Sequence, residues 1–280
     1  MTTLKAPIRY FGGKGGMLTK LLSYFPDPSL YDTYIDAYGG AGTVLLAKPL
    51  TKVEIYNDLN RNVYTLFKVL TNTELFAEFR HLCELALYDE ATSQDFRRAL
   101  VGDDLAPVQR AFYFWYVART KRAGGGGGFI VNPTVRRRMS KSTSDFLASV
   151  EGLLPLHERL SSVVVRNCDA LELIARCDYP RTLIYLDPPY VHETRTETRY
   201  ETDADNDHHE RLIELLSSLR SAYVVLSGYE HPLYAALNGF SKHQFEVNTV
   251  TSTNTPKVKT ETVWRNFEAS QMSMFTEASS

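Results

Sequence analysis

An apolar run that ends in an acid and two prolines constrains this chain more than any other segment. The run is typical of a buried β-strand; it comprises Leu183-Ile184-Tyr185-Leu186 and is followed directly by Asp187-Pro188-Pro189-Tyr190. Proline fixes its own φ, restricts the residue before it and has no N–H to donate, so the strand has to end in a stiff turn. Because open α/β sheets bind ligands at the carboxyl ends of their strands, we expect this turn to line a ligand site.

The chemistry of the turn suits a planar base that carries an exocyclic amine. The carboxylate of Asp187 and the carbonyl of Pro188 can accept the hydrogens of such an amine, and the ring of Tyr190 offers a surface on which the base can stack. We therefore interpret the turn as the part of the site that holds a base.

Strand and helix patterns alternate at both ends of the chain, which favours a parallel α/β sheet. The predicted strands are short apolar runs at residues 34–37, 53–56, 162–165, 183–186 and 223–227. An amphipathic helix is expected around residues 212–219. The last strands, 243–250 and 261–267, are expected to form an antiparallel pair.

One interval breaks this alternation. Roughly a hundred residues separate the second and third predicted strands, whereas an ordinary crossover needs only a few tens. The interval is helical in pattern from residue 63 to about 116, and residues 119–141 then contain seven basic residues, no acidic one and five consecutive glycines. We expect residues 65–158 to form an inserted domain with a basic edge at 119–141. The discontinuous remainder would comprise residues 1–64 and 159–280, with 268–280 as a flexible tail.

Several classes of protein are disfavoured by composition. Three cysteines without C-x-x-C spacing, Cys83, Cys168 and Cys177, indicate reduced thiols in a cytoplasmic protein. The N-terminus lacks the apolar core of a signal peptide, and no segment approaches membrane-spanning length. His208-His209 and His192-Glu193 lack the i, i+4 spacing of a metal pair. We expect neither a membrane nor a metal ion as a partner.

A glycine-rich motif follows the first predicted strand and is typical of a nucleotide site. In Asp36-Ala37-Tyr38-Gly39-Gly40-Ala41-Gly42, small residues let backbone N–H groups approach a ligand at a helix N-terminus. A tight turn without a ligand is the alternative. Asp58 ends the next strand, where an acid binds ribose hydroxyls or caps the following helix. Because no phosphate-binding lysine follows the first turn, a nucleoside without phosphate fits better.

A second glycine motif lies near the N-terminus, at Arg9-Tyr10-Phe11-Gly12-Gly13-Lys14. Two glycines flanked by cations can wrap the carboxylate of a small ligand, with Lys14 as a point charge. A solvated surface turn is an equally good interpretation of these residues alone.

Taken in order, these motifs resemble those of the Dam-type (D12 class) DNA adenine methyltransferases. The four matching segments are Arg9–Lys14, Tyr38–Gly42, Asp58–Asn60 and Asp187–Tyr190, and residues 261–267 resemble the final strand of that family. Family members commonly carry Pro-Phe where this chain has Ala37-Tyr38, and residues 65–158 match the family poorly.

The resemblance implies a Rossmann-like S-adenosylmethionine-dependent methyltransferase sheet with an inserted, mostly helical target-recognition domain. The implied reaction transfers a methyl group from S-adenosylmethionine to N6 of a flipped-out adenine in a specific sequence of double-stranded DNA. The resemblance also implies a cytoplasmic protein that is bacterial or encoded by a phage. Two alternatives stay open. One is an amino-methyltransferase that acts on cytosine N4 in DNA or on a guanine amine in ribosomal RNA, and the other is a non-catalytic DNA-binding relative.

The resemblance also implies roles for individual residues. The target base would be held by Asp187, Pro188, Pro189 and Tyr190. S-adenosylmethionine would be bound by Tyr10, Gly12, Gly13, Lys14, Asp36, Tyr38, Gly39, Gly40, Ala41, Gly42, Asp58 and Asp169. DNA would be contacted by the basic residues Arg119, Lys121, Arg122, Arg136, Arg137, Arg138, Lys141 and Arg195.

The C-terminal segment carries a separate hypothesis. Residues 271–275, Gln-Met-Ser-Met-Phe, resemble the short peptide by which bacterial replication proteins bind the sliding clamp. Such a peptide inserts an aromatic and an aliphatic side chain into a preformed groove. The bacterial sliding clamp is therefore a candidate partner through Gln271–Phe275.

Overall fold

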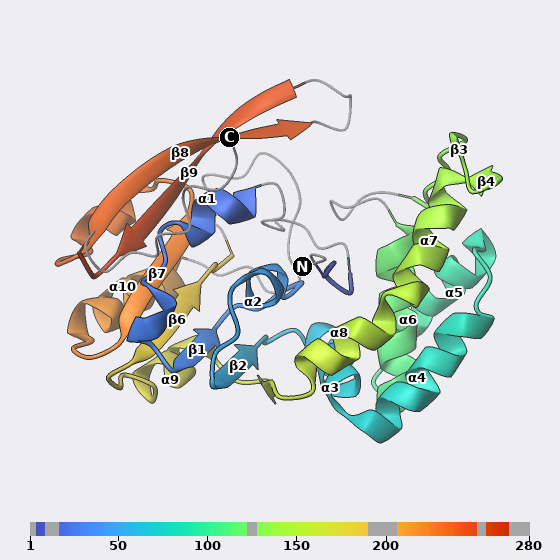
Figure 1. The fold of residues 1–280 in the computed structure, drawn as a ribbon, viewed down its shortest axis with the longest axis horizontal. Coiled ribbons are helices and arrows are strands. Elements are labelled where there is room, and N and C mark those ends of the chain that lie inside the picture. Colours follow the sequence, from blue (N-terminus) through green and yellow to red (C-terminus); the bar gives the residue numbers. More distant parts are fainter. Residues whose placement is uncertain (1–3, 9–16, 122–127, 190–205, 251–255, 269–280) are drawn as a thin grey trace. The chain divides into compact units, whose positions relative to one another are not determined.

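The computed structural model describes residues 4–8, 17–121, 128–189, 206–250 and 256–268. The chain divides into two compact units, each built from several segments. The first unit comprises residues 1–13, 40–46 and 58–167, and the second comprises residues 14–39, 47–57 and 168–280. The ribbon in Figure 1 shows the elements of both units.

The first unit consists mainly of helices (Figure 1). They are α3 (Arg61–Thr71), α4 (Thr73–Leu85), α5 (Glu90–Ala99), α6 (Pro107–Thr120), α7 (Lys141–Glu151) and α8 (Leu153–Leu160), and the short α2 (Thr43–Ala47) begins in this unit. Its strands are β3 (Val135–Arg136) and β4 (Met139–Ser140), which form an antiparallel hairpin, and β5 (Val164–Arg166).

Local sequence signals explain where these helices begin. Asn60 caps α3, Asn72 caps α4 and Asp89 caps α5, in each case through a side-chain oxygen that accepts a backbone N–H of the first turn. Helix α6 begins with a proline at its first position, where a missing N–H costs nothing. The side chains of Trp115 and Tyr116 in α6 are fully buried, so this helix forms the centre of the bundle.

The second unit contains the sheet. Its strands are β1 (Thr33–Asp36), β2 (Val53–Asn57), β6 (Thr182–Leu186), β7 (Tyr223–Gly228), β8 (Ser241–Val250) and β9 (Pro256–Arg265). Within this unit the strand order is β2-β1-β6-β7-β9-β8. The first four strands are parallel, β9 is antiparallel to β7, and β8 is antiparallel to β9. The remaining elements are α1 (Leu18–Leu22), η2 (Pro28–Leu30), α9 (Ala170–Ala175), α10 (Asn206–Ser218) and η4 (Pro232–Ala236).

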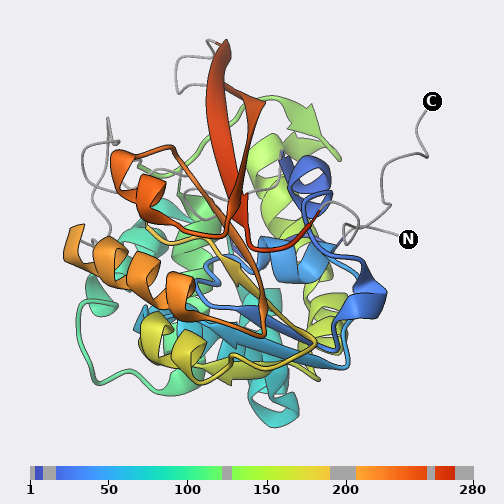
Figure 2. The same cartoon turned by 90° about the vertical axis from the view of Figure 1, so that its left-hand side faces the viewer.

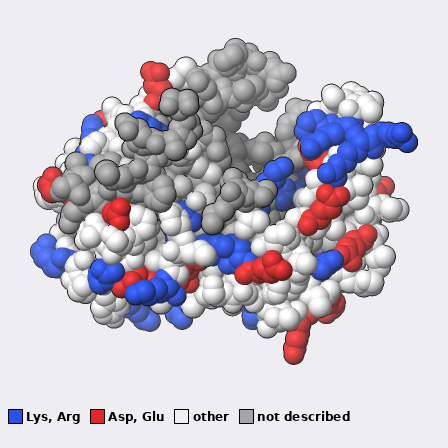
Figure 3. All heavy atoms as spheres, viewed as in Figure 1, with Lys and Arg blue, Asp and Glu red and all other residues white. Residues whose placement is uncertain are grey.

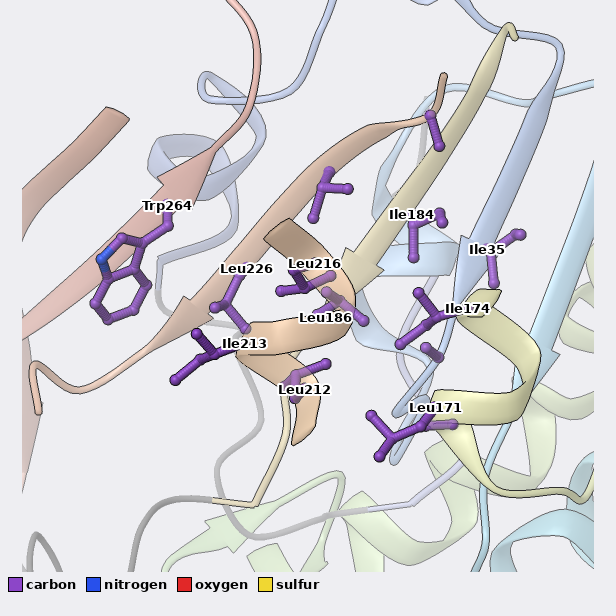
Figure 4. Close-up of a cluster of buried hydrophobic side chains, with 14 of the residues drawn as sticks. Ile35, Leu171, Ile174, Ile184, Leu186, Leu212, Ile213, Leu216, Leu226 and Trp264 are labelled. Carbon is purple, nitrogen blue, oxygen red and sulfur yellow. The ribbon is translucent and has the colours of Figure 1, made fainter. Parts of the chain in front are cut away.

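Apolar side chains bury both faces of the central strands. On one face, α9 and α10 pack against β1, β6 and β7, and Ile184 and Leu186 of β6 belong to the same buried cluster as Leu212 of α10 (Figures 2 and 4). On the other face, the ring of Phe25 packs on Tyr185 with centroids 5.6 Å apart. Burial of each such side chain contributes about 1.5–3 kcal/mol. A strand covered on both faces is continuously apolar, which explains why β6 was predictable.

The prediction of a mixed α/β fold with a mostly parallel sheet is confirmed. The third predicted strand begins at Val164 rather than at residue 162, because the backbone N–H of Val163 is bonded to the carbonyl of Leu160 at the end of α8. Strand β9 begins at Pro256, five residues before the predicted start at 261. The inserted domain at residues 65–158 stays a prediction. Among the described residues, no helix is long and apolar enough to cross a membrane.

Candidate active site

The carboxyl ends of three parallel strands lie at one edge of the second unit. Asp36, the last residue of β1, is in register with Tyr56 of β2 and with Tyr185 of β6. The next residues along these neighbouring strands are therefore Asn57 on β2, and Leu186 followed by Asp187 on β6. The Asp-Pro-Pro turn and the end of β1 thus lie side by side at the carboxyl ends of neighbouring parallel strands, the edge at which open α/β sheets bind ligands.

Asn57 holds this edge together. Its side-chain Nδ2 donates to the carbonyls of Ala37, at 3.0 Å, and Cys168, at 3.1 Å, and its Oδ1 accepts the backbone N–H of Cys168 at 3.1 Å. The side chain is 1% exposed. One buried amide therefore fixes the backbone on either side of the site, just after β1 and just before Asp169. No local sequence signal marks Asn57 for this role.

We expect Asn57→Asp to destabilise the protein by at least ~2 kcal/mol, because an oxygen would replace the donor that faces two buried carbonyls. The free energy of unfolding in urea would measure this loss. Asn167→Asp is the matched control, since Asn167 also donates to two carbonyls, those of Asp58 and Leu59, but is exposed. We expect a loss below about 1 kcal/mol at that position. Equal losses for the two variants would contradict the role assigned to Asn57.

The glycine motif forms a tight turn after β1. The backbone N–H of Gly39 donates to the carbonyl of Asn57 at 2.8 Å, and a Cβ at Gly39 would lie 2.1 Å from Cε2 of Tyr56. Gly40 and Gly42 have φ of 51° and 67°, in the left-handed region that side chains disfavour. Close packing or backbone conformation thus explains why glycine is found at each of these three positions. The sequence motif alone does not show whether a glycine is present for this reason or because a ligand approaches the backbone.

Asp58 binds the backbone of this turn within the first unit. Its Oδ2 accepts the N–H of Gly40 and its Oδ1 accepts the N–H of Asn60, both at 2.8 Å. Burial raises the pKa of the Asp58 carboxyl to about 6, against the lowering effect of these two bonds. Asn60, and not Asp58, is the N-cap of α3. Each carboxylate oxygen has further lone-pair capacity, so Asp58 can also accept hydrogen bonds from a ligand.

Three other predicted residues lie around the end of β1. Asp36 is 2% exposed and accepts a hydrogen bond from the Tyr34 hydroxyl at 3.3 Å. Tyr38 is hydrogen-bonded to His208 at 2.8 Å. Burial raises the pKa of Tyr38, and the charge of Asp169 adds to the effect. Asp169 also caps α9, accepting the N–H of Leu171 at 2.7 Å.

The turn after β6 has its own set of neighbours. Asp187 is half-buried and Pro188 is buried. Burial raises the pKa of Tyr234, and the negative charge of Asp187 raises it further. The Tyr234 hydroxyl is hydrogen-bonded to Nδ1 of His209 at 2.8 Å. His208 and His209 thus both contact tyrosines of this region. Sequence reasoning considered them only as metal ligands and offered no signal for these contacts.

The predicted DNA-binding residues that the structure describes fall into two groups in the first unit. At the end of α6, Nη2 of Arg119 donates to the carbonyl of Ala6 at 2.6 Å, and Lys121 pairs with Phe129 in an isolated β-bridge. The second group surrounds the β3–β4 hairpin, where Figure 3 shows Lys and Arg side chains gathered. In that group, Asp145 pairs with Arg136 and Lys141, and Glu151 pairs with Arg137, while the side chain of Arg138 is exposed.

Some predicted residues lie outside the described part of the chain. They are Tyr10, Gly12, Gly13, Lys14, Arg122, Tyr190, Arg195 and the clamp-like segment Gln271–Phe275. Among the residues that are described, no group of three or more His, Cys, Asp or Glu side chains is arranged to hold a metal ion.

Comparison with known protein families gives a match over most of the chain. The family model described as "D12 class N6 adenine-specific DNA methyltransferase" matches residues 10–263. None of the curated proteins matches this sequence. A solved structure, the putative methyltransferase yhhF from Escherichia coli, is 12% identical, with 85% of this chain and 78% of that chain covered and a TM-score of 0.31.

Proposed function

Because this chain belongs to the D12 class of N6 adenine-specific DNA methyltransferases, we propose that it transfers a methyl group from S-adenosylmethionine to N6 of an adenine flipped out of duplex DNA. The observation that carries the proposal is the position of the Asp187-Pro188-Pro189 turn. It directly follows β6, at the edge where the neighbouring β1 ends in Asp36 and enters the glycine turn.

The residues of the Asp-Pro-Pro turn align the amine. The N6 lone pair of adenine is delocalised into the ring, which makes the amine a poor nucleophile. The Asp187 carboxylate and the Pro188 carbonyl each accept a hydrogen bond from one of the two N–H groups of N6. These two bonds draw the nitrogen toward tetrahedral geometry and direct its lone pair out of the ring plane. Alignment of this kind can be worth roughly 7–11 kcal/mol. Tyr190 would stack on the flipped base, which contributes roughly 1–3 kcal/mol.

Residues of the glycine turn and Asp58 fit a nucleoside cofactor. When bound, S-adenosylmethionine supplies an electrophilic methyl group on a sulfonium. Asp58 would accept hydrogen bonds from the ribose hydroxyls. Each of its carboxylate oxygens accepts one backbone N–H, from Gly40 or Asn60, and has a further lone pair for this purpose. The other residues proposed to bind the cofactor are Tyr10, Gly12, Gly13, Lys14, Asp36, Tyr38, Gly39, Gly40, Ala41, Gly42 and Asp169.

Because the pKa of Asp58 is about 6, the affinity for S-adenosylmethionine should depend on pH if Asp58 binds the ribose. Above pH 6 the carboxylate is ionised and accepts hydrogen bonds from hydroxyls, whereas below pH 6 it is increasingly protonated. We expect the Kd for S-adenosylmethionine to rise by up to tenfold per pH unit between pH 6 and 5, and to be constant between pH 7 and 8. Calorimetric titration at each pH would measure this. Asp58→Asn should bind more weakly with no dependence on pH in this range, and a flat wild-type profile would contradict the role of Asp58.

The β3–β4 hairpin is the best-supported DNA contact in the described part of the first unit. Its two turn residues, Arg137 and Arg138, have φ of 53° and 61°. Such turns favour Asn-Gly, and a left-handed conformation costs an ordinary residue about 1–2 kcal/mol. Two arginines at strained positions therefore support a role in contacting phosphates or base edges. The partners Asp145 and Glu151 hold Arg136 and Arg137 at the hairpin.

Transfer of a tritiated methyl group to duplex DNA and, in parallel, to ribosomal RNA tests this proposal. We expect label in DNA only. Label in RNA only would favour the guanine-modifying alternative, and no label in either would favour a non-catalytic DNA-binding relative. The sliding clamp stays a candidate partner through Gln271–Phe275, which pull-down with the clamp protein would test independently of methyl transfer.

A further inference from the structure

The buried carboxylate at the end of β1 accepts a hydrogen bond from a tyrosine of the same strand. Tyr34 and Asp36 are two residues apart on β1, so their side chains lie on the same face of the sheet. The Tyr34 hydroxyl donates to Oδ2 of Asp36 at 3.3 Å, and the two residues are 0% and 2% exposed. A carboxylate that is shielded from water depends on such donors for its charge and its orientation. The Tyr34 hydroxyl therefore helps to fix Asp36.

An ammonium group lies over the ring of the same tyrosine. Nζ of Lys48, the residue that follows α2, is 4.3 Å from the centroid of the Tyr34 ring. A cation at this position is attracted to the face of the ring and draws electron density from it. The hydroxyl at the far end of the ring then becomes a stronger hydrogen-bond donor. Lys48 can therefore act on Asp36 through Tyr34.

Lys48 is held over the ring by partners from the same unit. Its Nζ donates to Oε1 of Glu54 and to Oγ1 of Thr51, both at 2.5 Å, and to the carbonyl of Pro49 at 2.8 Å. Glu54 is in register with Tyr34 on the neighbouring strand β2, and the side chains of Lys48 and Glu54 are 0% and 2% exposed. A buried ion pair is costly to desolvate and often stabilises a protein no more than apolar residues of similar volume. A role in polarising Tyr34 gives this pair a function besides stability.

We propose that Tyr34 and the Lys48–Glu54 pair are positioning residues that align the Asp36 carboxylate with a cationic group of the cofactor. Asp36 is the last residue of β1, directly before the glycine turn. S-adenosylmethionine carries two cations, the α-ammonium group and the sulfonium, whereas its adenosine part is neutral. A buried carboxylate of fixed orientation suits a cation, because the attraction between opposite charges is stronger where water is excluded. This inference rests on the proposed function and concerns cofactor binding alone.

Titration calorimetry of the full-length protein with three probes tests the inference. S-adenosylmethionine carries both cations, S-adenosylhomocysteine carries only the ammonium group, and 5′-methylthioadenosine carries neither. Tyr34→Phe removes the hydroxyl but keeps the ring beneath Lys48. We expect it to raise the Kd of S-adenosylmethionine about tenfold and the Kd of methylthioadenosine less than about twofold. An equal rise for S-adenosylhomocysteine would identify the ammonium group as the cation that Asp36 binds, and a rise for S-adenosylmethionine alone would identify the sulfonium.

A variant without the ion pair tests the part played by Lys48. Lys48→Met/Glu54→Leu replaces both charges by apolar side chains and leaves the Tyr34 hydroxyl in place. We expect the Kd of S-adenosylmethionine to rise about threefold relative to that of methylthioadenosine. When Tyr34→Phe is also present, loss of the pair should cause no further rise, because the pair acts through the hydroxyl. The same rise in both backgrounds would overturn the role assigned to the pair.

Tyr116→Phe is the matched control for Tyr34→Phe. Tyr116 is also fully buried, and its hydroxyl donates to the carbonyl of Leu87 and accepts the N–H of Asp89 in the first unit. We expect this control to change each Kd by less than about twofold. The inference would be overturned if Tyr34→Phe left the Kd of S-adenosylmethionine unchanged, or if it raised all three Kd values by the same factor, as a purely structural role predicts. A folded wild type that binds none of the three probes would instead contradict the proposed function, and the inference with it.

Discussion

Gly39→Ala should lower the free energy of unfolding by about 3 kcal/mol or more. A Cβ at this position would lie 2.1, 2.5 and 2.6 Å from three ring atoms of Tyr56, which is 0% exposed and has no room to withdraw. The backbone of Gly39 is also held by its bond to the carbonyl of Asn57. Overpacking of this severity forces the backbone or the ring to move, and the cost exceeds that of one extra methylene in an ordinary core.

The midpoint of urea unfolding would measure this effect, and Gly152→Ala is the matched control. There a Cβ would meet two carbonyl oxygens at 3.6 and 3.7 Å, which is ordinary contact. We expect the control to change the midpoint little. Tyr56→Val removes the ring that the new Cβ would meet. In a protein that carries Tyr56→Val, Gly39→Ala should therefore lower the free energy of unfolding by less than it does when Tyr56 is present. Equal midpoints for Gly39→Ala and Gly152→Ala would show that the turn is not packed as described.

Asp187→Asn should reduce the rate of methyl transfer by about 10²–10³-fold while leaving the fold and the affinity for S-adenosylmethionine nearly unchanged. The substitution preserves shape but replaces a charged acceptor by a group that can present an N–H to the target amine. Loss of one positioned electrostatic contact in an active site typically has an effect of this size. Single-turnover kinetics with saturating DNA would measure the step directly, without contributions from product release.

Glu214→Gln is the control for Asp187→Asn, because Glu214 is an exposed carboxylate of α10 in the same unit. We expect wild-type kinetics for it. Urea unfolding of both variants would show that neither effect arises from loss of structure. A single-turnover rate for Asp187→Asn within a few-fold of the wild type would remove Asp187 from the mechanism.

Local sequence signals predicted those parts of the fold that depend on nearby residues. Strand β6 was predictable because burial on both faces makes it continuously apolar, and the two prolines fix where it ends. Strand β9 was predicted too short because its first residues, Pro256-Lys257-Val258-Lys259, form no apolar run and pair only with β8. The start of β5 depended on a turn bond from Val163, which no strand pattern reveals.

The sequence motifs identified candidate residues for the site, but they did not predict the hydrogen bonds that join residues distant in the chain. The glycines and acids at strand ends follow local rules, so Asp36, Asp58 and Asp187 could be chosen from the sequence alone. The contact of Tyr38 with His208 joins residues whose order in the chain gives no hint of contact. Asn57 was missed for the same reason, since its carbonyl partners lie on two other segments.

Mass spectrometry of nucleosides from duplex DNA tests the central claim most directly. Full-length protein would be incubated with unmethylated DNA and S-adenosylmethionine that carries a deuterated methyl group, and the DNA would then be digested to nucleosides. We predict label in N6-methyldeoxyadenosine, and none when the protein is Asp187→Ala. Label in N4-methyldeoxycytidine instead, or unlabelled DNA after incubation with folded protein that binds the cofactor, would contradict the account.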